Sequence, residues 1–354
     1  MKKEEIREEI KKRNREALII KKDAYYVAES EAAEMVILTE DRSFTLCHRL
    51  NGDRAKEESQ TDKIIVFSET EVPLREEEDV IFGKSHEVIT DILSNLGVEK
   101  VGYDQISQNI LKKLEEEYPA EYTSESDLIG DLRKTKTEKE IKRIKKSGQI
   151  AKRGMEKARE MSETGNTELE IAAEVEYEMR KIGSEEPAFT TVVAGGKNSR
   201  YPHFKASNKE LKEGELLVVD LGAKWKNYNS DMTRTFGISP SREQRKLMEV
   251  TKRAKKEALK KLEGGTETSE IDKTVRKVFH KEGYEKYYLH STGHGVGLSI
   301  HEPPRISPSS DETLKENMVV TVEPGLYTKK LGGCRFEDTF LVKKNGYENL
   351  TSPD

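Results

Sequence analysis

The sequence predicts an α/β (α+β) protein of two domains, on three observations. The chain has 354 residues, which is more than most single domains contain. Helical and strand-like patterns alternate over residues 1–130, and after a polar connector at 131–136 an order of two helices followed by strands occurs twice. We therefore place a small N-terminal domain at 1–136 and a larger C-terminal domain at 137–354.

In the N-terminal domain, apolar periodicity changes repeatedly between the helical and the extended type. We expect helices over 4–15, 86–96 and 106–118, and strands over 17–20, 35–39, 44–47, 64–67 and 98–103. The domain shows no catalytic constellation. Its two histidines, His48 and His86, are isolated in the sequence, and a surface or packing role is expected for each.

In the C-terminal domain, capping boxes mark the start of two helices. Thr137 pairs with Glu140 in one box, and Ser241 pairs with Gln244 in the other. We expect helices over 137–161, 167–182, 241–262 and 269–282, and a strand over 188–194. The repeated order indicates two related halves whose sheets pack into one curved layer backed by helices.

Four carboxylates stand in strand-like surroundings of this domain, two in each of two expected hairpins. They occur in the runs VVDLGA (218–223), SDMTRTF (230–236), VVTVEPG (319–325) and GCRFEDTFLV (333–342). An aspartate within an apolar run is costly to bury unless it is neutralised, and four carboxylates cannot share a pocket as bare anions. The two hairpins therefore predict one site that holds divalent cations.

A nitrogen donor for that site lies between the hairpins. Three of the chain's seven histidines, His290, His294 and His301, fall within twelve positions, among glycines that permit close approach. Clustered histidine and carboxylate side chains are typical of a metal site.

The motifs VDLGA, SDMTRT, GHGVGL, VEPG and RFED, in this order, closely resemble those of the pita-bread metallopeptidases, in the branch of Xaa-Pro dipeptidases (prolidases) and Xaa-Pro aminopeptidases. The resemblance covers the chain after Lys136 strongly and the N-terminal third weakly. It implies a creatinase-like N-terminal domain, a C-terminal pita-bread domain with pseudo-two-fold halves, and a homodimer.

The resemblance implies two metal ions with five ligands: Asp220, Asp231, His294, Glu323 and Glu337. Asp231 and Glu337 would bridge the ions, Asp220 would bind one of them, and His294 with Glu323 would bind the other. An oxygen-rich set with one imidazole favours Mn²⁺, with Co²⁺, Zn²⁺ and Fe²⁺ as alternatives. Glu323 would also carry the proton to the leaving nitrogen of proline, which has no hydrogen of its own.

The resemblance also implies further site residues. His301 would hydrogen-bond the substrate carbonyl and His203 would line the proline side, while His290 would lie at the rim. Tyr327 and Arg335 would orient the metal-site carboxylates. Two readings of Arg305 stay open: a bidentate clamp for the C-terminal carboxylate of a dipeptide, or a surface arginine.

Composition excludes several other classes of protein. The net charge of −5 offers no general attraction to nucleic acid, and no apolar run approaches the ~20 residues of a membrane span. Two distant cysteines, Cys47 and Cys334, favour buried thiols in a cytoplasmic protein over a disulfide framework. The abundance of Lys and Glu fits either a heat-adapted source or ordinary solubility.

The sequence therefore predicts a soluble cytoplasmic metallopeptidase that hydrolyses Xaa-Pro bonds in peptides. An Xaa-Pro dipeptidase is favoured over an Xaa-Pro aminopeptidase by the short N-terminal domain and Arg305. A methionine aminopeptidase is disfavoured, because that branch usually lacks such an N-terminal domain. A metal-free binding module of the same fold is a further alternative, disfavoured because all five ligands are present.

Overall fold

The computed structural model describes residues 2–351, which form two compact units that divide between Leu132 and Arg133. Helix α6 (Leu128–Lys134) spans this division. Among the described residues, no helix combines the length and the apolar content needed to cross a lipid bilayer.

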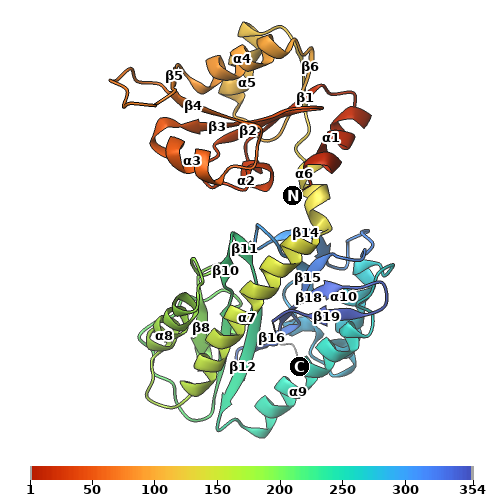
Figure 1. Ribbon diagram of the computed structural model, residues 1–354. Helices are drawn as coiled ribbons and strands as arrows, with labels where there is room; N and C mark the ends of the chain where they lie inside the picture. Colours follow the sequence, from red (N-terminus) through yellow and green to blue (C-terminus); the bar gives the residue numbers. More distant parts are fainter. Residues whose placement is uncertain (1, 352–354) are drawn as a thin grey trace. The chain divides into compact units, whose positions relative to one another are not determined.

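The first unit is built on a seven-stranded mixed sheet (Figure 1). Its strand order is β5-β4-β3-β2-β1-β6-β7; β1, β2 and β3 pair antiparallel, and the outer pairs are parallel. The strands are β1 (Ala17–Ile20), β2 (Met35–Thr39), β3 (Ser43–His48), β4 (Lys63–Ser68), β5 (Ile81–Phe82), β6 (Lys100–Tyr103) and β7 (Glu121–Ser124). The helices are α1 (Lys3–Lys12), α2 (Ala24–Ala28), η1 (Arg49–Asn51), α3 (Gly52–Glu58), α4 (Ser85–Leu96) and α5 (Gln108–Glu117).

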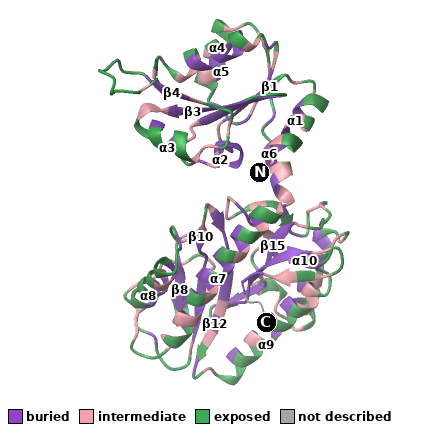
Figure 2. Ribbon diagram, in the orientation of Figure 1, coloured by how far each residue is buried: buried purple, intermediate pink, exposed green. Residues whose placement is uncertain are grey.

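Both faces of this sheet are covered, which explains why its central strands are apolar without alternation. Successive side chains of a strand point to opposite faces. Leu46 packs in the core formed with α4 and α5, whereas its neighbour Cys47 packs against Ala55 of α3. A strand buried on both sides needs apolar residues at every position, as the buried run of β2 shows (Figure 2).

Most expected elements of this unit are present, with corrections at their ends. The helix expected over 4–15 ends at Lys12, and Asn14 then takes a left-handed conformation with φ of 57°. The helices α2 and α3 and the strands β5 and β7 were not anticipated, because each is short or lacks a clear apolar period.

The second unit carries four long helices around two sheets. The helices are α7 (Glu138–Glu160), α8 (Glu168–Lys181), α9 (Arg242–Leu259) and α10 (Thr268–Lys281), with short turns η2 (Gly196–Arg200) and η3 (Glu285–Tyr287). One sheet has the order β12-β9-β8, the other β14-β13-β15-β18-β19, and β10-β11 and β16-β17 are separate hairpins. The strands are β8 (Val192–Gly195), β9 (Glu215–Leu221), β10 (Lys224–Trp225), β11 (Tyr228–Asn229), β12 (Met232–Ile238), β13 (Gly293–Gly295), β14 (Glu302–Ile306), β15 (Val319–Val322), β16 (Gly325–Thr328), β17 (Gly332–Arg335), β18 (Asp338–Val342) and β19 (Tyr347–Asn349).

The unit contains two halves of the same order, helix, helix, strands. The turns between the paired helices match: Gly165 before α8 has φ of 95°, and Gly265 before α10 has φ of 96°. Each half has its own core, one formed by α7 and α8 with β8, β9 and β12, the other by α9 and α10 with β15, β16 and β18. The repetition expected from the sequence is therefore present.

Side-chain caps fix the starts of the helices as the sequence indicates. Thr137 and Glu140 form a capping box at α7, and Ser241 and Gln244 form one at α9. Such reciprocal bonds satisfy backbone N–H groups that have no partner inside the helix.

The polar segment 131–136, expected as a connector, is partly helical and partly buried. Helix α6 continues to Lys134, and Arg133 and Lys136 are buried. Both cations pair with the buried carboxylate of Glu302, with a Lys136 Nζ to Oε1 distance of 2.6 Å. The charged residues Arg133 and Lys136 of this segment therefore form a buried ion-pair cluster with Glu302.

Candidate metal centre

Five side chains converge from the strands of both halves of the second unit. Thr233 of β12 stands opposite Asp220 of β9 in the antiparallel register. Val322 of β15 stands opposite Asp338 of β18, so the next residues, Glu323 and Glu337, leave the two strands at the same end. The five side chains are Asp220, Asp231, His294, Glu323 and Glu337.

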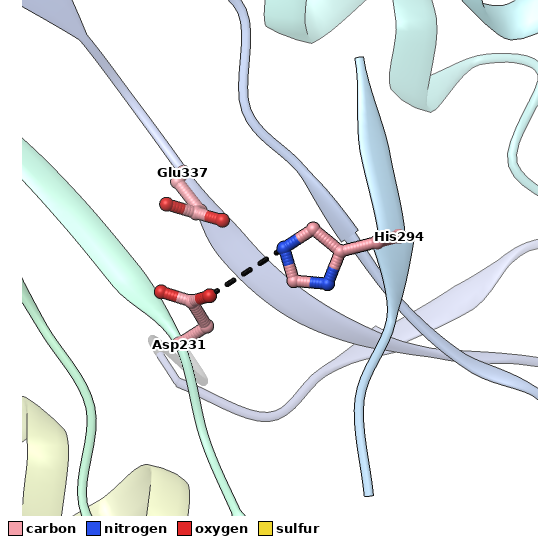
Figure 3. Close-up of side chains that lie close together, drawn as sticks. All are labelled: Asp231, His294 and Glu337. Atoms are coloured by element: carbon pink, nitrogen blue, oxygen red, sulfur yellow. Dashed lines mark ion pairs between the residues drawn. The ribbon is translucent and has the colours of Figure 1, made fainter. Parts of the chain in front are cut away.

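His294 lies closest to the carboxylates through its Nε2 atom. This atom is 3.6 Å from Asp231 Oδ2 and 3.7 Å from Glu323 Oε1. Ligand atoms of Asp231, His294 and Glu337 all lie within 4.8 Å of one another (Figure 3). These separations leave room for a cation between the donors.

The tautomer of His294 suits it to bind a cation. Its Nδ1 atom is 3.0 Å from the carbonyl oxygen of Gly295 and donates to it. Nε2 then carries the lone pair and faces the carboxylates. Burial lowers the pKa of His294 to about 4, so the ring is neutral at physiological pH.

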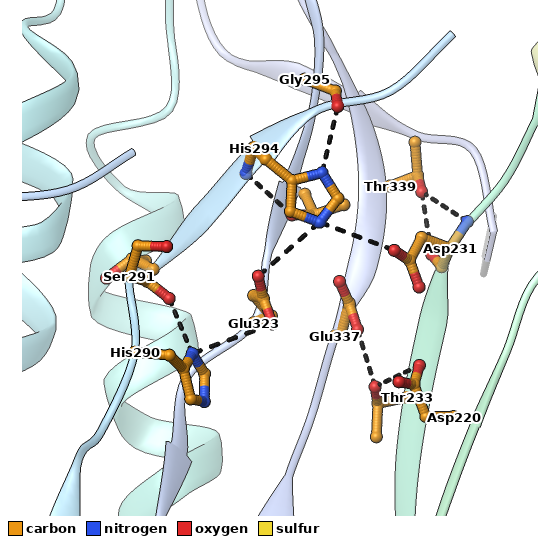
Figure 4. A network of polar contacts seen from close by, with 12 residues as sticks. Asp220, Asp231, Thr233, His290, Ser291, His294, Gly295, Glu323, Glu337 and Thr339 are labelled. Carbon is orange, nitrogen blue, oxygen red and sulfur yellow. Dashed lines mark hydrogen bonds and ion pairs between the residues drawn. The ribbon is translucent and has the colours of Figure 1, made fainter. Parts of the chain in front are cut away.

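The hydroxyl of Thr233 connects two of the carboxylates (Figure 4). Its Oγ1 is 2.9 Å from Asp220 Oδ1 and 2.6 Å from Glu337 Oε2. Arg335 donates its Nε to the same hydroxyl at 3.0 Å and its Nη2 to Asp220 Oδ2 at 2.5 Å. One guanidinium and one hydroxyl thus fix two carboxylates and offset part of their charge.

The remaining negative charge is poorly compensated by the protein alone. Burial, together with repulsion from Glu337 and Asp220, raises the pKa of Asp231 well above its ordinary value. Burial and the charge of Glu337 do the same for Glu323. For Glu337, burial and Asp220 raise the pKa to about 7. Such shifts mark groups that need protons or cations.

Two oxygen atoms of this cluster test whether a cation fits. Asp231 Oδ1 and Glu337 Oε1 are buried, and neither accepts a hydrogen bond from any described residue. A buried carboxylate oxygen without a partner is costly. Both carboxylates belong to the group that could hold a metal ion with His294, and a divalent cation beside them could satisfy these oxygens.

A cavity of about 860 Å³ opens over the cluster. All of the predicted site residues except Tyr327 line it, including His203, His290, His301 and Arg305. Its apolar wall consists of Phe189, Val192, Pro202, Phe204, Ile300 and Pro303. The cavity thus combines an acidic floor with an apolar side.

The other predicted residues hold defined places at this cavity. The rings of His301 and His294 lie 4.3 Å apart. Arg305 of β14 stands opposite His294 of β13 in the register, so both side chains leave the same face. His290 approaches Glu323 Oε2 to 3.9 Å through Nδ1.

Tyr327 is buried and lies between two site residues. Its hydroxyl accepts from Arg335 Nη1 at 2.7 Å and is 3.0 Å from His290 Nε2. Burial raises the pKa of Tyr327 to about 12, so the hydroxyl keeps its proton. It therefore links His290 to the guanidinium that holds Asp220.

The segment that carries His203 is held by a carboxylate that the sequence did not single out. Glu168, the first residue of α8, is fully buried. It accepts from the backbone N–H of Gly195 at 2.7 Å, from Asn198 Nδ2 at 2.9 Å and from Ser207 Oγ at 2.6 Å. These bonds fix both ends of the segment around His203.

Other contributing residues were also missed by sequence reasoning. Thr233 follows Asp231 by two positions, the spacing that places side chains on one face of a strand, and this signal could have identified it. Lys205 and Glu312 line the cavity without any such pattern.

The chain is similar to known proteins in sequence and in structure. Residues 142–344 match the model of Metallopeptidase family M24. The chain is 42% identical over 279 residues to the Xaa-Pro dipeptidase of Pyrococcus furiosus, covering 78% of this chain and 79% of that protein. It also resembles the solved prolidase from Pyrococcus furiosus (TM-score 0.85, 36% identity, 98% and 99% of the two chains) and the X-Pro aminopeptidase from Thermotoga maritima (TM-score 0.88, 29%, 100% and 98%). The expected fold, an N-terminal α/β domain before a pita-bread domain, is confirmed.

Proposed function

Because the chain belongs to metallopeptidase family M24, we propose that it is an Xaa-Pro dipeptidase that works with two divalent metal ions. The observation that carries the proposal is the convergence of four carboxylates and one neutral imidazole on the floor of a partly apolar cavity. The Xaa-Pro dipeptidase of Pyrococcus furiosus, to which the chain is similar over most of its length, supports the choice of substrate.

The metal ligands in this proposal are Asp220, Asp231, His294, Glu323 and Glu337. Asp231 and Glu337 would bridge the ions, which agrees with their unpaired buried oxygens. Four carboxylates exceed what one ion usually takes and suit a pair. Mn²⁺ is the proposed metal, because oxygen donors predominate. When bound, the pair would polarise the scissile carbonyl and acidify water.

The protein's own groups would then handle the protons and the substrate. Glu323 lies in the cavity beside the other carboxylates, so it can accept a proton and pass it to the leaving nitrogen of proline. Partial burial lowers the pKa of His301, so the neutral ring can donate a hydrogen bond to the substrate carbonyl. His203 would contact the proline side of the bond, beside the apolar wall.

Arg305 decides the length of the substrate in this proposal. Its guanidinium, on the same face as His294, would bind the C-terminal carboxylate of a dipeptide. Lys205 also lines the cavity and adds positive charge. The second candidate is an Xaa-Pro aminopeptidase, which the likeness to the X-Pro aminopeptidase of Thermotoga maritima favours.

The remaining assignments rest on the composition of the sequence and on the family. We infer a cytoplasmic protein that acts on proline-containing peptides and not on nucleic acid or membranes. A homodimer is proposed from the family alone.

The test compares hydrolysis of the dipeptides Met-Pro and Ala-Pro with that of an Ala-Pro-Xaa tripeptide. Protein stripped with a chelator is assayed before and after addition of Mn²⁺, with Asp231→Asn as the inactive control. Metal-dependent cleavage of the dipeptides alone supports the proposal and the role of Arg305. Cleavage of the tripeptide shows an aminopeptidase, and cleavage of neither by metal-loaded protein contradicts the proline specificity.

A further inference from the structure

A second cavity, of about 500 Å³, lies between helix α9 and the strands of the second unit. It shares no lining residue with the cavity of the metal centre. Its lining is unusually basic for a chain whose net charge is −5. The residues are Arg234, Lys252, Lys255, Lys256, Leu259, Lys260, Phe336, Asp338 and Tyr347.

Helix α9 presents its lysines to this cavity as one stripe. Lys252, Lys255, Lys256 and Leu259 follow the i, i+3, i+4, i+7 spacing that defines one helical face. Cations are common in the last turn of a helix because the helix macrodipole favours them there. Arg234 also lines the cavity but lies on β12, so the macrodipole does not account for its position.

The buried part of the cavity contains two cations and one carboxylate. Arg234 Nη2 is 2.7 Å from Asp338 Oδ1, and Lys255 bonds the other oxygen of the same carboxylate. Lys255 and Asp338 are both buried. Asp338 is therefore fully engaged and has no capacity to neutralise further lysines.

The rim adds positive charge that the protein does not compensate. Among residues 2–351, no carboxylate oxygen lies within 4.0 Å of the ammonium groups of Lys252 or Lys256. Lys252 Nζ instead lies over the ring of Phe336, 4.8 Å from its centroid. Lys260 alone has its own partner, Glu257, at 2.7 Å. Cations gathered at such short range repel one another unless an anion joins them.

We propose that this cavity binds a multivalent oxyanion, a phosphate group above all. Arg234 has N–H groups beyond the three that it donates to Asp338, Glu337 and Thr233, and Lys252 and Lys256 supply point charges. Guanidinium and ammonium groups are the two donor types that proteins use for phosphate. The proposal does not depend on the function proposed above, since it involves none of the metal ligands.

Arg234 connects this cavity with the strand ends beside the candidate metal centre. Its Nη1 donates to the backbone carbonyls of Glu337 at 2.5 Å and of Thr233 at 3.0 Å. The guanidinium of Arg234 thus lines the basic cavity and also hydrogen-bonds the backbone of the strand ends beside Glu337.

The test measures phosphate binding by isothermal titration calorimetry at low ionic strength, with the full-length, metal-loaded protein and no excess metal. Lys252→Gln/Lys256→Gln is compared with wild type and with Lys142→Gln/Lys146→Gln. The control pair has the same i, i+4 spacing on the exposed face of α7 and lies outside the cavity. All four lysines are exposed, so folding should be retained, which circular dichroism checks.

Wild type and the control pair should each bind one more phosphate per chain than Lys252→Gln/Lys256→Gln, or bind it at least about tenfold more tightly. Phosphate bound at the metals is common to all three proteins and cancels. A nucleoside monophosphate as second probe distinguishes the source: tighter binding than phosphate identifies a phosphorylated metabolite, and equal binding identifies phosphate itself. Equal phosphate binding by all three proteins, or no saturable binding at millimolar phosphate, overturns the proposal.

Discussion

Arg335 and Asp220 form a buried ion pair in which Nη2 lies 2.5 Å from Oδ2. The same guanidinium also donates to Thr233 and Tyr327, so its planar shape fixes three neighbours at once. Arg335→Lys keeps the charge and loses this fork. We expect the affinity for Mn²⁺ to fall about 10–100-fold, measured by competition with a chelating indicator.

The matched control for that substitution is Arg305→Lys, at the same cavity but without a contact to the carboxylates of the cluster among the described residues. Its metal affinity should stay at the wild-type value. Equal affinities for wild type and Arg335→Lys would show that the fork does not organise the centre.

Asp231→Asn should abolish metal binding yet stabilise the metal-free protein at about pH 8. The folded-state pKa of Glu337, about 7, exceeds its ordinary value of 4.5. Its contribution to stability is therefore complete below about pH 4.5 and is lost as the pH rises through about 7. Burial and repulsion from Glu337 and Asp220 also raise the pKa of Asp231 well above its ordinary value, so ionisation of Asp231 adds to this loss. Asp231→Asn removes that part of it.

We expect the free energy of unfolding of metal-free Asp231→Asn to exceed that of metal-free wild type by about 1–3 kcal/mol at pH 8, measured with urea. At about pH 5 the difference in unfolding free energy between the variant and wild type should shrink, because the carboxyl group of Asp231 in wild type is then protonated. A variant that is less stable than wild type at both values would contradict the account of charge repulsion.

Metal binding should release protons near neutral pH. Asp231 and Glu323 have strongly raised pKa values and that of Glu337 is about 7, so these groups hold protons at about pH 6 that a cation must displace. His294, with a pKa of about 4, has none to release. Apparent affinity should therefore rise with pH. Calorimetry in two buffers of different ionisation enthalpy counts the protons, and zero release at pH 6 would refute the prediction.

Glu168→Gln should destabilise the fold and impair catalysis without changing metal affinity. A carboxamide replaces one of the two oxygens with an NH2 group. That group would face other donors, either Gly195 N and Asn198 Nδ2 or the backbone N of Ser207. We expect a loss of about 1–3 kcal/mol in unfolding free energy and a lower kcat/KM, because the segment around His203 loosens. Glu174→Gln, exposed on the same helix, is the control and should match wild type in both measurements.

The site residues that were easiest to predict from the sequence are the carboxylates that interrupt apolar runs. Asp220 and Glu323 stood out because a carboxylate in a buried strand needs a partner. The first expected hairpin formed between β9 and β12, whereas the run 333–342 divides into β17 and β18, which pair in separate sheets. Helix starts were predictable because capping is local.

Other features depended on contacts between distant segments, which no local pattern encodes. Glu302 bonds Lys136, which lies 166 positions away in the sequence, and Glu168 bonds the segment from Gly195 to Ser207, which lies 27 to 39 positions away. The basic cavity needs α9 to pack on β12 before its lysines meet Arg234.

The duplicated halves of the second unit divide the five proposed metal ligands between them: the first half supplies Asp220 and Asp231, and the second supplies His294, Glu323 and Glu337. The halves join at Ser239, which has φ of 48°, and Pro240, just before α9. Neither half carries all five proposed ligands, so the site requires residues from both halves. Cut at this joint, the two fragments should be inert apart and should reassemble into a split enzyme when mixed with metal.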